Sequence, residues 1–336
     1  MLSYAHSNSL NQQIRVTTSA RLHMGFYDLT GTTGSMFGGL GLAIDSPCTQ
    51  VQISESKNLI IDAKSSDSVA KIVENLIKSL NLLNINLPNN FSVKILQSIP
   101  EHAGLGSGTQ MALAIGAALN QLFGLNLTIA QIASAAMRGK RSGIGIGAFA
   151  QGGFLVDSGK LNDEIPGTAM RHTFPNDWRI LLVLDSTHTG VHGAAELQAF
   201  QTLAPAKSAL RSMVFERMLP ALQRSDLLTF GVYMQVLQAY NGDYFAPIQG
   251  GRYASRSVEL ALAWLKNNGA PCTGQSSWGP TGFAILRDQQ QAERLQAQAQ
   301  LAFADNPNIS FKIVRGKNTG ASDSGIAVSE VIIKES

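Results

Sequence analysis

The segment over residues 99–110 interleaves glycines with hydroxyl residues and stands directly before an apolar stretch with helical spacing. Glycine accepts a positive φ and lets an anion approach the backbone, because it has no Cβ. The first turn of a helix adds unpaired N–H groups and the positive end of its dipole. The segment therefore predicts a phosphate cradle, with the candidate binding residues Gly104, Leu105, Gly106, Ser107, Gly108, Thr109 and Gln110.

This cradle differs from two common nucleotide-binding loops. A Walker A loop needs Gly-Lys followed by Ser or Thr, which this segment lacks. A dinucleotide fingerprint needs the spacing G-x-G-x-x-G within a βαβ unit, and neither the spacing nor the unit is found here. The alternative interpretation is a tight turn that only begins a helix, for which fewer glycines would suffice.

Charged side chains elsewhere could bind or activate an anionic substrate. Arg21 and His23 follow a strand-like segment at a spacing of two, which places them on one face. Arg141 stands among glycines, and a guanidinium suits bidentate recognition of oxyanions. Glu101 and His102 precede the cradle and could orient metal-bound water or an acceptor. We expect these residues to be catalytic; a surface arginine, a core histidine and ordinary loop residues are the plainer alternatives.

Asp45 and Trp278 are candidates of a different kind. Asp45 ends an apolar run, where its carboxylate could bind a metal ion or a ribose hydroxyl, or simply form a turn. Trp278 lies in a glycine-rich loop, where its indole could stack on an aromatic ring or fill a cleft between domains. We expect Asp45 to be the metal ligand.

The elements that must position these residues mix helices and strands without a regular βαβ alternation, which predicts an α+β fold. The cradle lies between an alternating strand over 91–98 and an apolar helix over about 108–123, and Thr128 is expected to cap the next helix. Further strands are expected over 14–20, 50–54, 148–157 and 327–333, and a further helix over 194–203. Glycines and prolines between 160 and 178 predict two domains, over residues 12–170 and 171–336.

Composition narrows the class of protein. The chain has 336 residues with 44% hydrophobic and 15% charged side chains, enough for a packed core and too few charges for a disordered chain. A formal net charge of +3 without a basic cluster predicts no nucleic-acid partner, and the two distant cysteines form no zinc motif. No membrane-spanning run or signal-peptide pattern is present, so we expect a cytoplasmic protein without a membrane partner. A homodimer is expected on base rates.

A strand followed by P-x-x-x-G-L-G-S-G and an apolar helix resembles the second motif of the GHMP superfamily, which includes galactokinases, homoserine kinases and mevalonate kinases. Residues 19–25 fall where that superfamily has its first motif, and residues 274–282 take the place of its third. The resemblance implies an N-terminal domain like domain 2 of a small-subunit ribosomal protein, joined to a ferredoxin-like C-terminal domain. It also implies that the third motif contributes the substrate-binding residues Gln275, Ser276, Ser277 and Trp278.

One position separates this chain from kinases of that superfamily. Their segment S-G-x-D supplies an aspartate near the phosphoryl acceptor, whereas this chain has Gly145 at the aspartate position. Glycine has no side chain to accept a proton or to orient a hydroxyl. Some superfamily kinases lack this aspartate, so a small-molecule kinase that uses ATP remains an alternative. A sugar-phosphate sensor without catalytic activity is a second alternative.

Several motifs together resemble a non-kinase family of this superfamily, the β-ribofuranosylaminobenzene 5′-phosphate synthases. These motifs lie over residues 21–29, 37–45, 104–110, 141–145 and 274–281. The resemblance implies a pentosyltransferase that joins phosphoribosyl pyrophosphate to 4-aminobenzoate or 4-hydroxybenzoate, with release of carbon dioxide and pyrophosphate. It also implies Mg²⁺ as the cofactor and a place in tetrahydromethanopterin biosynthesis. The polar residues retained in these motifs argue against the sensor.

Overall fold

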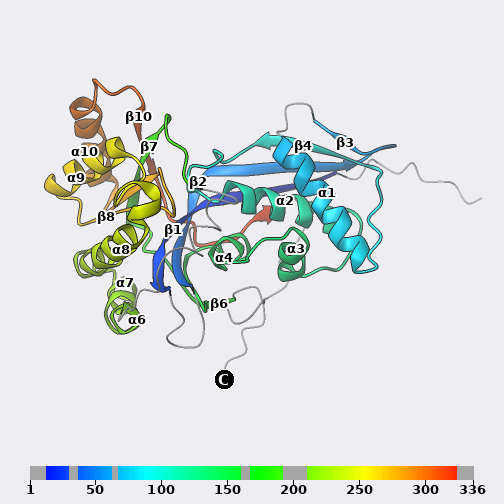
Figure 1. Ribbon diagram of the computed structural model, residues 1–336, viewed down its shortest axis with the longest axis horizontal. Coiled ribbons are helices and arrows are strands. Elements are labelled where there is room, and N and C mark those ends of the chain that lie inside the picture. The colour runs from blue at the N-terminus through cyan, green and yellow to red at the C-terminus, as the bar shows by residue number, and fades with distance from the viewer. Residues whose placement is uncertain (1–12, 30–36, 63–66, 160–166, 192–209, 324–336) are drawn as a thin grey trace, which may run out of the picture.

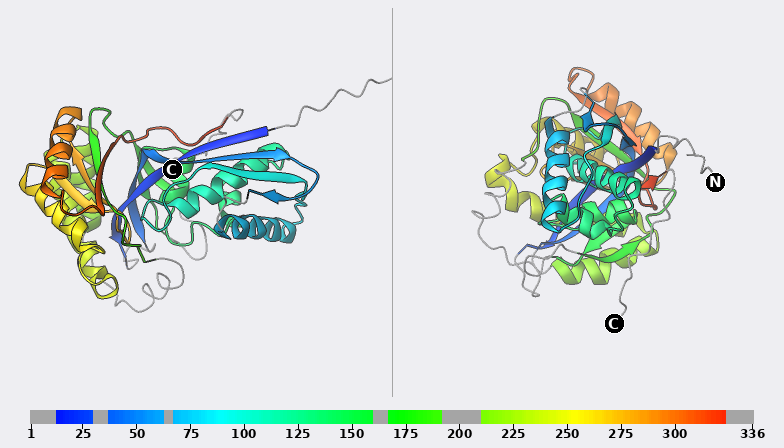
Figure 2. Two further views of the ribbon diagram at one scale, coloured as in Figure 1. Left: turned by 90° about the horizontal axis from the view of Figure 1, so that it is seen from above. Right: turned by 90° about the vertical axis from the view of Figure 1, so that its right-hand side faces the viewer.

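The computed structural model describes residues 13–29, 37–62, 67–159, 167–191 and 210–323 (Figure 1). Two long strands, β1 (Gln13–Asp28) and β2 (Gly38–Glu55), pair antiparallel and run side by side into both lobes of the molecule (Figure 2). Side chains near the start of β1 alternate between buried and exposed, whereas nearly all of those from Thr18 onward are buried. The second part of β1 therefore lies inside the junction between the lobes.

Both long strands extend well beyond the expected ranges of 14–20 and 50–54. The added parts contain several glycines and a proline, which have weak strand preference, so local pattern does not reveal them. They pair nonetheless, with register shifts between Ser19 and Arg21 and between His23 and Gly25. Such bulges bend a strand and re-aim its side chains. Arg21 and His23 consequently lie within β1 and not after it.

The first lobe is built on a mixed sheet whose strand order, over the described residues, is β11–β1–β2–β4–β3; β5 also pairs with β2, and β6 pairs with β5. Helices α1 (Asp67–Leu82), α2 (Ser107–Leu122) and α3 (Ile129–Ala135) bury their apolar faces against this sheet in one core. Thr128 begins α3 with a capping box. The other strands are β3 (Ile60–Ile61), β4 (Phe91–Gln97), β5 (Phe154–Asp157), β6 (Thr168–His172) and β11 (Ser322–Asp323).

The second lobe is an antiparallel sheet in the order β10–β7–β9–β8. Its elements follow one another as strand, helices, two strands, helix and strand, which is the βαββαβ order of a ferredoxin-like fold. This order confirms the expected α+β class and the ferredoxin-like second half. The strands are β7 (Arg179–Asp185), β8 (Cys272–Gln275), β9 (Gly282–Leu286) and β10 (Ile309–Val314).

Helices cover both faces of this second sheet. Helices α9 (Arg256–Asn267) and α10 (Gln289–Ala302) pack on one face. The other face carries a helical run formed by α6 (Leu210–Met213), the π-helix η1 (Val214–Met218), α7 (Leu219–Gln223) and α8 (Leu227–Gln249). Because successive strand residues point to opposite faces, each strand of this sheet contributes to both cores.

A continuous hydrophobic core joins the two lobes. Leu22 and Met24 of β1 and Leu42 of β2 pack in the same cluster as Ile180 and Phe283 of the second sheet. After the second lobe, β11 brings the chain back to pair with β1. The shared core therefore sets the position of each lobe against the other. The division into residues 12–170 and 171–336 stays a prediction.

Residues 144–150 form a helix where the sequence predicts part of a strand over 148–157. Helix α4 (Ile144–Ala150) buries Ile144 and Ala148 against β2 and β5, and β5 begins only at Phe154. Gly152 and Gly153, with φ of 65° and 81°, end the helix. A short buried apolar run fits either structure, so its hydrophobic pattern does not distinguish them. The expected helix over 194–203 and strand over 327–333 lie outside the described residues.

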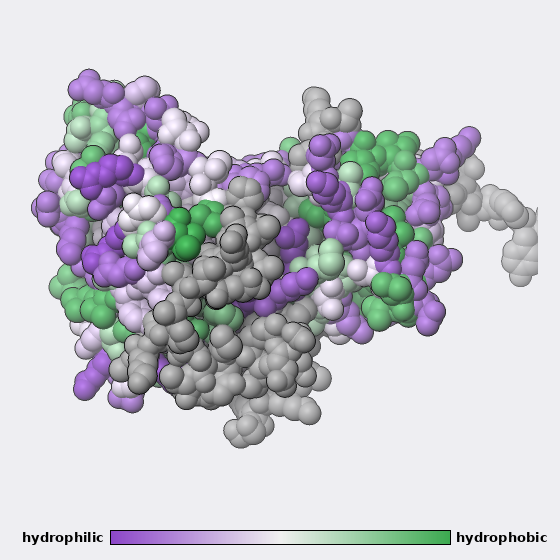
Figure 3. All heavy atoms as spheres, in the orientation of Figure 1, coloured by the Kyte–Doolittle hydropathy of each residue, from purple (hydrophilic) through white to green (hydrophobic). Residues whose placement is uncertain are grey.

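The face of the molecule in Figure 3 is largely hydrophilic, with separate hydrophobic areas between the polar ones. Across the described part of the chain, every helix is too short or too polar to cross a membrane. In the first lobe, exposed apolar side chains include Leu59 and Ile60 at β3 and Leu82 and Leu83 at the end of α1. The expected homodimer stays a prediction.

Candidate functional site

A cavity of about 500 Å³ lies at the junction of the lobes, between the loop that precedes α2, the second part of β1 and the loop that follows β8. The fold brings most of the predicted site residues to this one cavity, although they come from separate parts of the chain. Those that line it are Arg21, His23, Glu101, His102, Gly104, Gly106, Ser107, Gly108, Thr109, Arg141, Ser277 and Trp278.

The glycine cradle adopts the backbone that the sequence predicts. Gly106 is the N-cap of α2 with φ 83°, and its carbonyl accepts hydrogen bonds from the N–H groups of Thr109 and Gln110, both at 3.1 Å. Gly104 has φ 76°, and a Cβ there would lie 2.4 Å from the carbonyl oxygen of Ser276. The first N–H groups of a helix have no partner within the helix, so the start of α2 is suited to an anion.

Arg21 connects β1 to the cradle. Its backbone N–H donates to the carbonyl of Leu105 at 3.1 Å, and its Nη1 donates to the carbonyl of Gly104 at 2.7 Å. Its Cζ and Nε lie 3.1 Å from the position that a Cβ on Gly106 would take. The guanidinium therefore lies along the cradle and adds a positive charge beside the start of α2.

His23 is a neutral side chain at the back of the cavity. It is 5% exposed, and no hydrogen bond to its Nε2 is formed within the described residues. Burial, and then the nearby charge of Arg21, lower the pKa of His23 to about 3. The ring lies 4.6 Å from that of Phe26, measured between centroids. His23 therefore contributes a neutral ring to the cavity wall, and its Nε2 has no partner in the described residues.

Two predicted cradle residues support the cavity from behind. Leu105 is 1% exposed and belongs to the core that joins the lobes. Gln110 is fully buried; its Oε1 accepts from the hydroxyl of Thr18, and its Nε2 donates to the carbonyl of Gly145 at 2.8 Å. Both residues hold the start of α2 in place, and neither lines the cavity.

Gln275 and Ser276 also lie behind the cavity wall. The Oγ of Ser276 donates to the carbonyl of Gly104 at 2.7 Å and accepts from the N–H of His23 at 3.0 Å. Gln275 accepts a hydrogen bond from the N–H of Ala254 at 2.8 Å and donates to the carbonyl of Ser277 at 3.1 Å. These two residues therefore connect the loop after β8 to the cradle and to the segment that precedes α9, while Ser277 and Trp278 reach the cavity.

Asp45, the expected metal ligand, is not brought to the cavity. It is exposed, its Oδ1 accepts from the N–H of Arg315 at 2.9 Å, and its own N–H donates to the carbonyl of Arg315 at 2.9 Å. Strand β2 runs on through Asp45, and the segment that follows β10 pairs with it there. The carboxylate therefore joins the two lobes at a distance from the other candidate residues.

The fit of a magnesium ion rests on Glu101, which carries the one carboxylate among the described residues that line the cavity. The Oγ of Ser68 donates to Glu101 at 2.9 Å, and the hydroxyl of Ser107 lines the same cavity. In the described ranges, no group of three or more His, Cys, Asp or Glu could hold a metal ion by itself. Magnesium often combines one protein carboxylate with the phosphates of its substrate. Glu101 and Ser107 therefore fit a magnesium ion that binds together with a phosphorylated ligand.

Positive charge dominates the cavity wall. Arg21, Arg138, Lys140 and Arg141 line it, and the start of α2 adds the positive end of a helix dipole. Such a concentration of charge favours a ligand with several negative charges. The sequence reasoning singled out Arg21 and Arg141 but missed Arg138 and Lys140. The signal that could have found them is the dense run Arg-Gly-Lys-Arg over 138–141.

Asp157, at the end of β5, is a further residue that sequence reasoning missed. It is 1% exposed, and its Oδ1 accepts from the N–H groups of Gly39 at 2.9 Å and Gly159 at 3.0 Å. Its Oδ2 accepts from the hydroxyl of Ser142 at 2.6 Å and from the N–H of Gly143 at 3.1 Å. The carboxylate therefore fixes the turn that follows Arg141. Burial raises the pKa of Asp157 to about 6, against the opposing effect of these hydrogen bonds.

The variant Asp157→Asn is expected to be destabilised, because the amide nitrogen faces donors that Oδ2 now satisfies; we expect about 1–3 kcal/mol at pH 5. The folded pKa of about 6 exceeds the ordinary value of 3.8, so the contribution of this group to stability is full below 3.8 and falls as the pH rises through 6. The difference in free energy of unfolding between wild type and variant should therefore shrink from pH 5 to pH 7, as measured by urea denaturation. Exposed Asp305→Asn is the control, and a difference that grows with pH would contradict this assignment.

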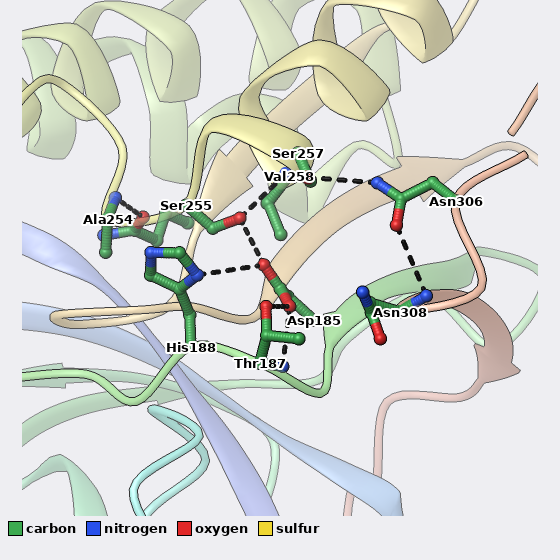
Figure 4. Close-up of polar contacts among 10 residues, drawn as sticks. Asp185, Thr187, His188, Ala254, Ser255, Ser257, Val258, Asn306 and Asn308 are labelled. Carbon is green, nitrogen blue, oxygen red and sulfur yellow. Dashed lines mark hydrogen bonds and ion pairs between the residues drawn. The ribbon is translucent and has the colours of Figure 1, made fainter.

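The segment after β7 is anchored in the second lobe and reaches the loop before the cradle. Asp185 accepts a hydrogen bond from the Oγ of Ser255 at 2.6 Å, and the Nδ1 of His188 lies 3.4 Å from Oδ2 of Asp185 (Figure 4). Further along, the N–H of Gly190 donates to the carbonyl of His102 at 2.8 Å. The second lobe therefore helps to hold the loop from which the cradle begins.

Comparison with known families identifies the fold. Residues 67–153 match the GHMP kinases N terminal domain, and residues 218–305 match the GHMP kinases C terminal domain. The crystal structure of a homoserine kinase from Cytophaga hutchinsonii superposes with a TM-score of 0.65 at 17% identity, over 95% of this chain and 100% of that chain. This protein therefore has the two-lobed fold of the GHMP kinases.

Two curated relatives indicate the family to which the chain belongs within this fold. The beta-ribofuranosylphenol 5′-phosphate synthase of Archaeoglobus fulgidus is 30% identical over 295 residues, which cover 81% of this chain and 87% of the relative. The corresponding protein of Methanocaldococcus jannaschii is 31% identical over 300 residues, which cover 80% of this chain and 88% of the relative. The chain belongs to the family of the beta-ribofuranosylphenol 5′-phosphate synthases, which confirms the resemblance found in its motifs and supports an enzyme.

Proposed function

We propose that this protein is a pentosyltransferase that joins phosphoribosyl pyrophosphate to 4-hydroxybenzoate and releases carbon dioxide and pyrophosphate. The observation that carries this proposal is the cavity with its glycine cradle and cationic wall, beside which Gly145 stands where kinases of this superfamily have an aspartate. The name of the relatives specifies a phenol, which favours 4-hydroxybenzoate over 4-aminobenzoate as the acceptor. The product would be a β-C-riboside 5′-phosphate, the proposed precursor for tetrahydromethanopterin biosynthesis.

The chemistry of the proposed reaction needs no general base at the reacting carbon. The bond between ribose C1 and the pyrophosphate oxygen breaks, and its electron pair leaves with pyrophosphate. The ring carbon that bears the carboxylate forms the new bond to C1. The bond from that carbon to the carboxylate then breaks, carbon dioxide leaves, and the electron pair restores the aromatic ring. A site without a carboxylate at Gly145 is compatible with this sequence of steps.

The cradle and its cations would bind the donor. Negative charge develops on the pyrophosphate as it leaves, and fixed donors aimed at such charge stabilise a transition state. The N–H groups at the start of α2, together with Arg21 and Arg141, line the cavity where that charge would lie. When a magnesium ion is bound by Glu101 and Ser107, it would neutralise part of the phosphate charge.

The acceptor would bind at the aromatic part of the cavity. Phe26 and Trp278 line it, and Trp278 packs on Phe245 with ring centroids 4.4 Å apart. Trp278 is 5% exposed, so its position is fixed by the surrounding structure. A rigid aromatic wall favours the flat ring of a hydroxybenzoate. The neutral His23, which lies against Phe26, can offer a hydrogen bond to the acceptor there.

The decisive experiment follows the carboxyl carbon of the acceptor. Incubation with phosphoribosyl pyrophosphate, Mg²⁺ and carboxyl-labelled 4-hydroxybenzoate should release one labelled carbon dioxide for each pyrophosphate formed. The product should be a β-C-riboside, because in-line displacement on an α-pyrophosphate inverts C1. Pyrophosphate release without carbon dioxide, or an O-linked riboside that keeps its carboxylate, would contradict the proposed chemistry. Formation of ADP from ATP with homoserine, mevalonate or galactose would favour the kinase alternative.

A further inference from the structure

Arg138 is directed toward the start of α2 by an unusual turn at the end of α3. The N–H of Met137 donates to the carbonyl of Ser134 at 2.8 Å, and the N–H of Arg138 donates to the carbonyl of Ala133 at 2.8 Å. These two bonds form a Schellman motif, in which the first residue after the helix cap adopts a left-handed conformation. Glycine usually occupies that position, but here it is Met137 with φ 54°. A non-glycine residue in this conformation is strained.

The guanidinium of Arg138 lies beside the first turn of α2. Its Nη1 and Nη2 are 3.6 Å and 3.7 Å from the position that a Cβ on Gly108 would take. Its Nε is buried and has no hydrogen-bond partner within the described residues. None of the ion pairs found there includes Arg138. The side chain therefore brings several N–H donors to the helix start, and the described residues supply no acceptor for Nε.

The surroundings of Arg138 are unfavourable for a positive charge. Burial, and then the charge of Arg141, lower the pKa of Arg138. The start of α2, with its own partial positive charge, lies on the same side. A partly buried charge with like charges around it is destabilising unless a ligand supplies an opposite partner. An anion bound between Arg138 and α2 would balance the positive charge of the guanidinium and that of the helix start.

A second residue that lines the same cavity also has a buried nitrogen without a partner in the described residues. His23 is 5% exposed, and its Nε2 has no hydrogen-bond partner within the described ranges. Buried polar atoms are nearly always paired, so each unpaired one needs an explanation. Unsatisfied nitrogens on Arg138 and His23, which stand far apart in the sequence, are explained together if a ligand completes this cavity.

The geometry points to Arg138 as a binding residue for the pyrophosphate group of the donor, held between its guanidinium and the N-terminus of α2. This inference rests on the proposed function and adds to it the position of the leaving group. A planar guanidinium can contact oxygen atoms of two linked phosphoryl groups at once. Pyrophosphate also carries more negative charge than the 5′-phosphate, so it would balance the positive charge around Arg138 more fully. The 5′-phosphate would then lie elsewhere in the cavity.

The test compares Arg138→Gln and Arg138→Lys with Arg294→Gln, an exposed arginine on α10 that serves as the control for net charge. Calorimetric titration uses inorganic pyrophosphate with Mg²⁺ as one probe and ribose 5-phosphate as the other. We expect Arg138→Gln to weaken pyrophosphate binding at least tenfold, Arg138→Lys to weaken it less, and ribose 5-phosphate binding to change by less than twofold. Without ligand, the melting temperature of Arg138→Gln should equal or exceed that of wild type, because a half-buried positive charge is removed from beside Arg141 and the start of α2.

Three results would overturn the inference. Pyrophosphate affinity equal to that of wild type would show that Arg138 does not contact this group. A loss confined to ribose 5-phosphate would assign Arg138 to the other phosphate. A lower melting temperature without ligand would show a structural role. Arg138-dependent pyrophosphate binding in a protein that releases no carbon dioxide would support this inference and contradict the proposed function, so the two can fail separately.

Discussion

Replacing Gly106 with valine is expected to abolish the binding of phosphoribosyl pyrophosphate while both lobes stay folded. A Cβ at this position would lie 3.1 Å from Cζ and Nε of Arg21, and the methyl groups of valine would extend further, so the guanidinium would have to leave the cradle. The added side chain would also cover the first N–H groups of α2. The loss of two charge-assisted hydrogen bonds, at about 1.5–3 kcal/mol each, predicts a fall in affinity of about 100-fold or more. Calorimetry with inorganic pyrophosphate measures this fall.

Gly250 provides a matched control for this variant. Its φ of 84° and ψ of 14° are close to the 83° and 19° of Gly106, and nothing lies within 4 Å of the position that its Cβ would take. Gly250→Val therefore introduces the same backbone strain without the contact with Arg21. We expect both variants to lose similar amounts of thermal stability and only Gly106→Val to lose pyrophosphate. Equal affinities in the two variants would refute the cradle.

Introducing a carboxylate at Gly145 is expected to reduce the synthase reaction without creating a kinase. A Cβ at Gly145 would lie 3.0 Å from Cγ2 of Thr109, which lines the cavity, so the Gly145→Asp side chain would stand beside the cradle. Two like charges roughly 8 Å apart repel by about 2 kcal/mol at an effective dielectric constant near 20. This repulsion predicts a fall in pyrophosphate affinity of about 30-fold, with a matching fall in carbon dioxide release.

The neutral variant Gly145→Asn separates charge from size in this experiment. Asparagine has nearly the same shape as aspartate, and acidic residues in the first turn of a helix are favourable, so both variants should fold. We expect Gly145→Asn to keep most of the pyrophosphate affinity that Gly145→Asp loses. Equal losses in both would attribute the effect to crowding at Thr109. ATP-dependent phosphorylation of homoserine by Gly145→Asp would show that this position alone separates the kinase from the synthase.

Features that depend on a few neighbouring residues could be predicted from the sequence. Glycines with positive φ, hydroxyl residues and an apolar helix define the cradle within about one turn of chain, because φ preferences and helix dipoles act locally. The capping box at Thr128 is a contact across three residues and is equally visible. The motifs that carry the family resemblance are also short segments, so the family could be predicted before the fold was seen.

Buried apolar segments were harder to predict. A strand was expected over 148–157, but residues 148–150 belong to α4 and β5 begins only at Phe154. Strand β2 begins at Gly38, twelve residues before the expected strand over 50–54, because pairing with β1 outweighs the weak strand preference of its glycines. In both cases the contacts that decide the structure come from other parts of the chain.

Short segments of the chain are enough to indicate which of them can bind an anion, which residue types are available to do so, and the family to which the chain belongs. Which of these residues meet depends on the tertiary structure. The bulges in β1 bring Arg21 to Gly104, the Met137 turn directs Arg138 to α2, and β2 carries Asp45 away from the cavity. Backbone preference is a property of a few adjacent residues, whereas strand register and packing between lobes depend on the whole chain. The cradle could therefore be predicted from the sequence, whereas the side chains that complete it could not.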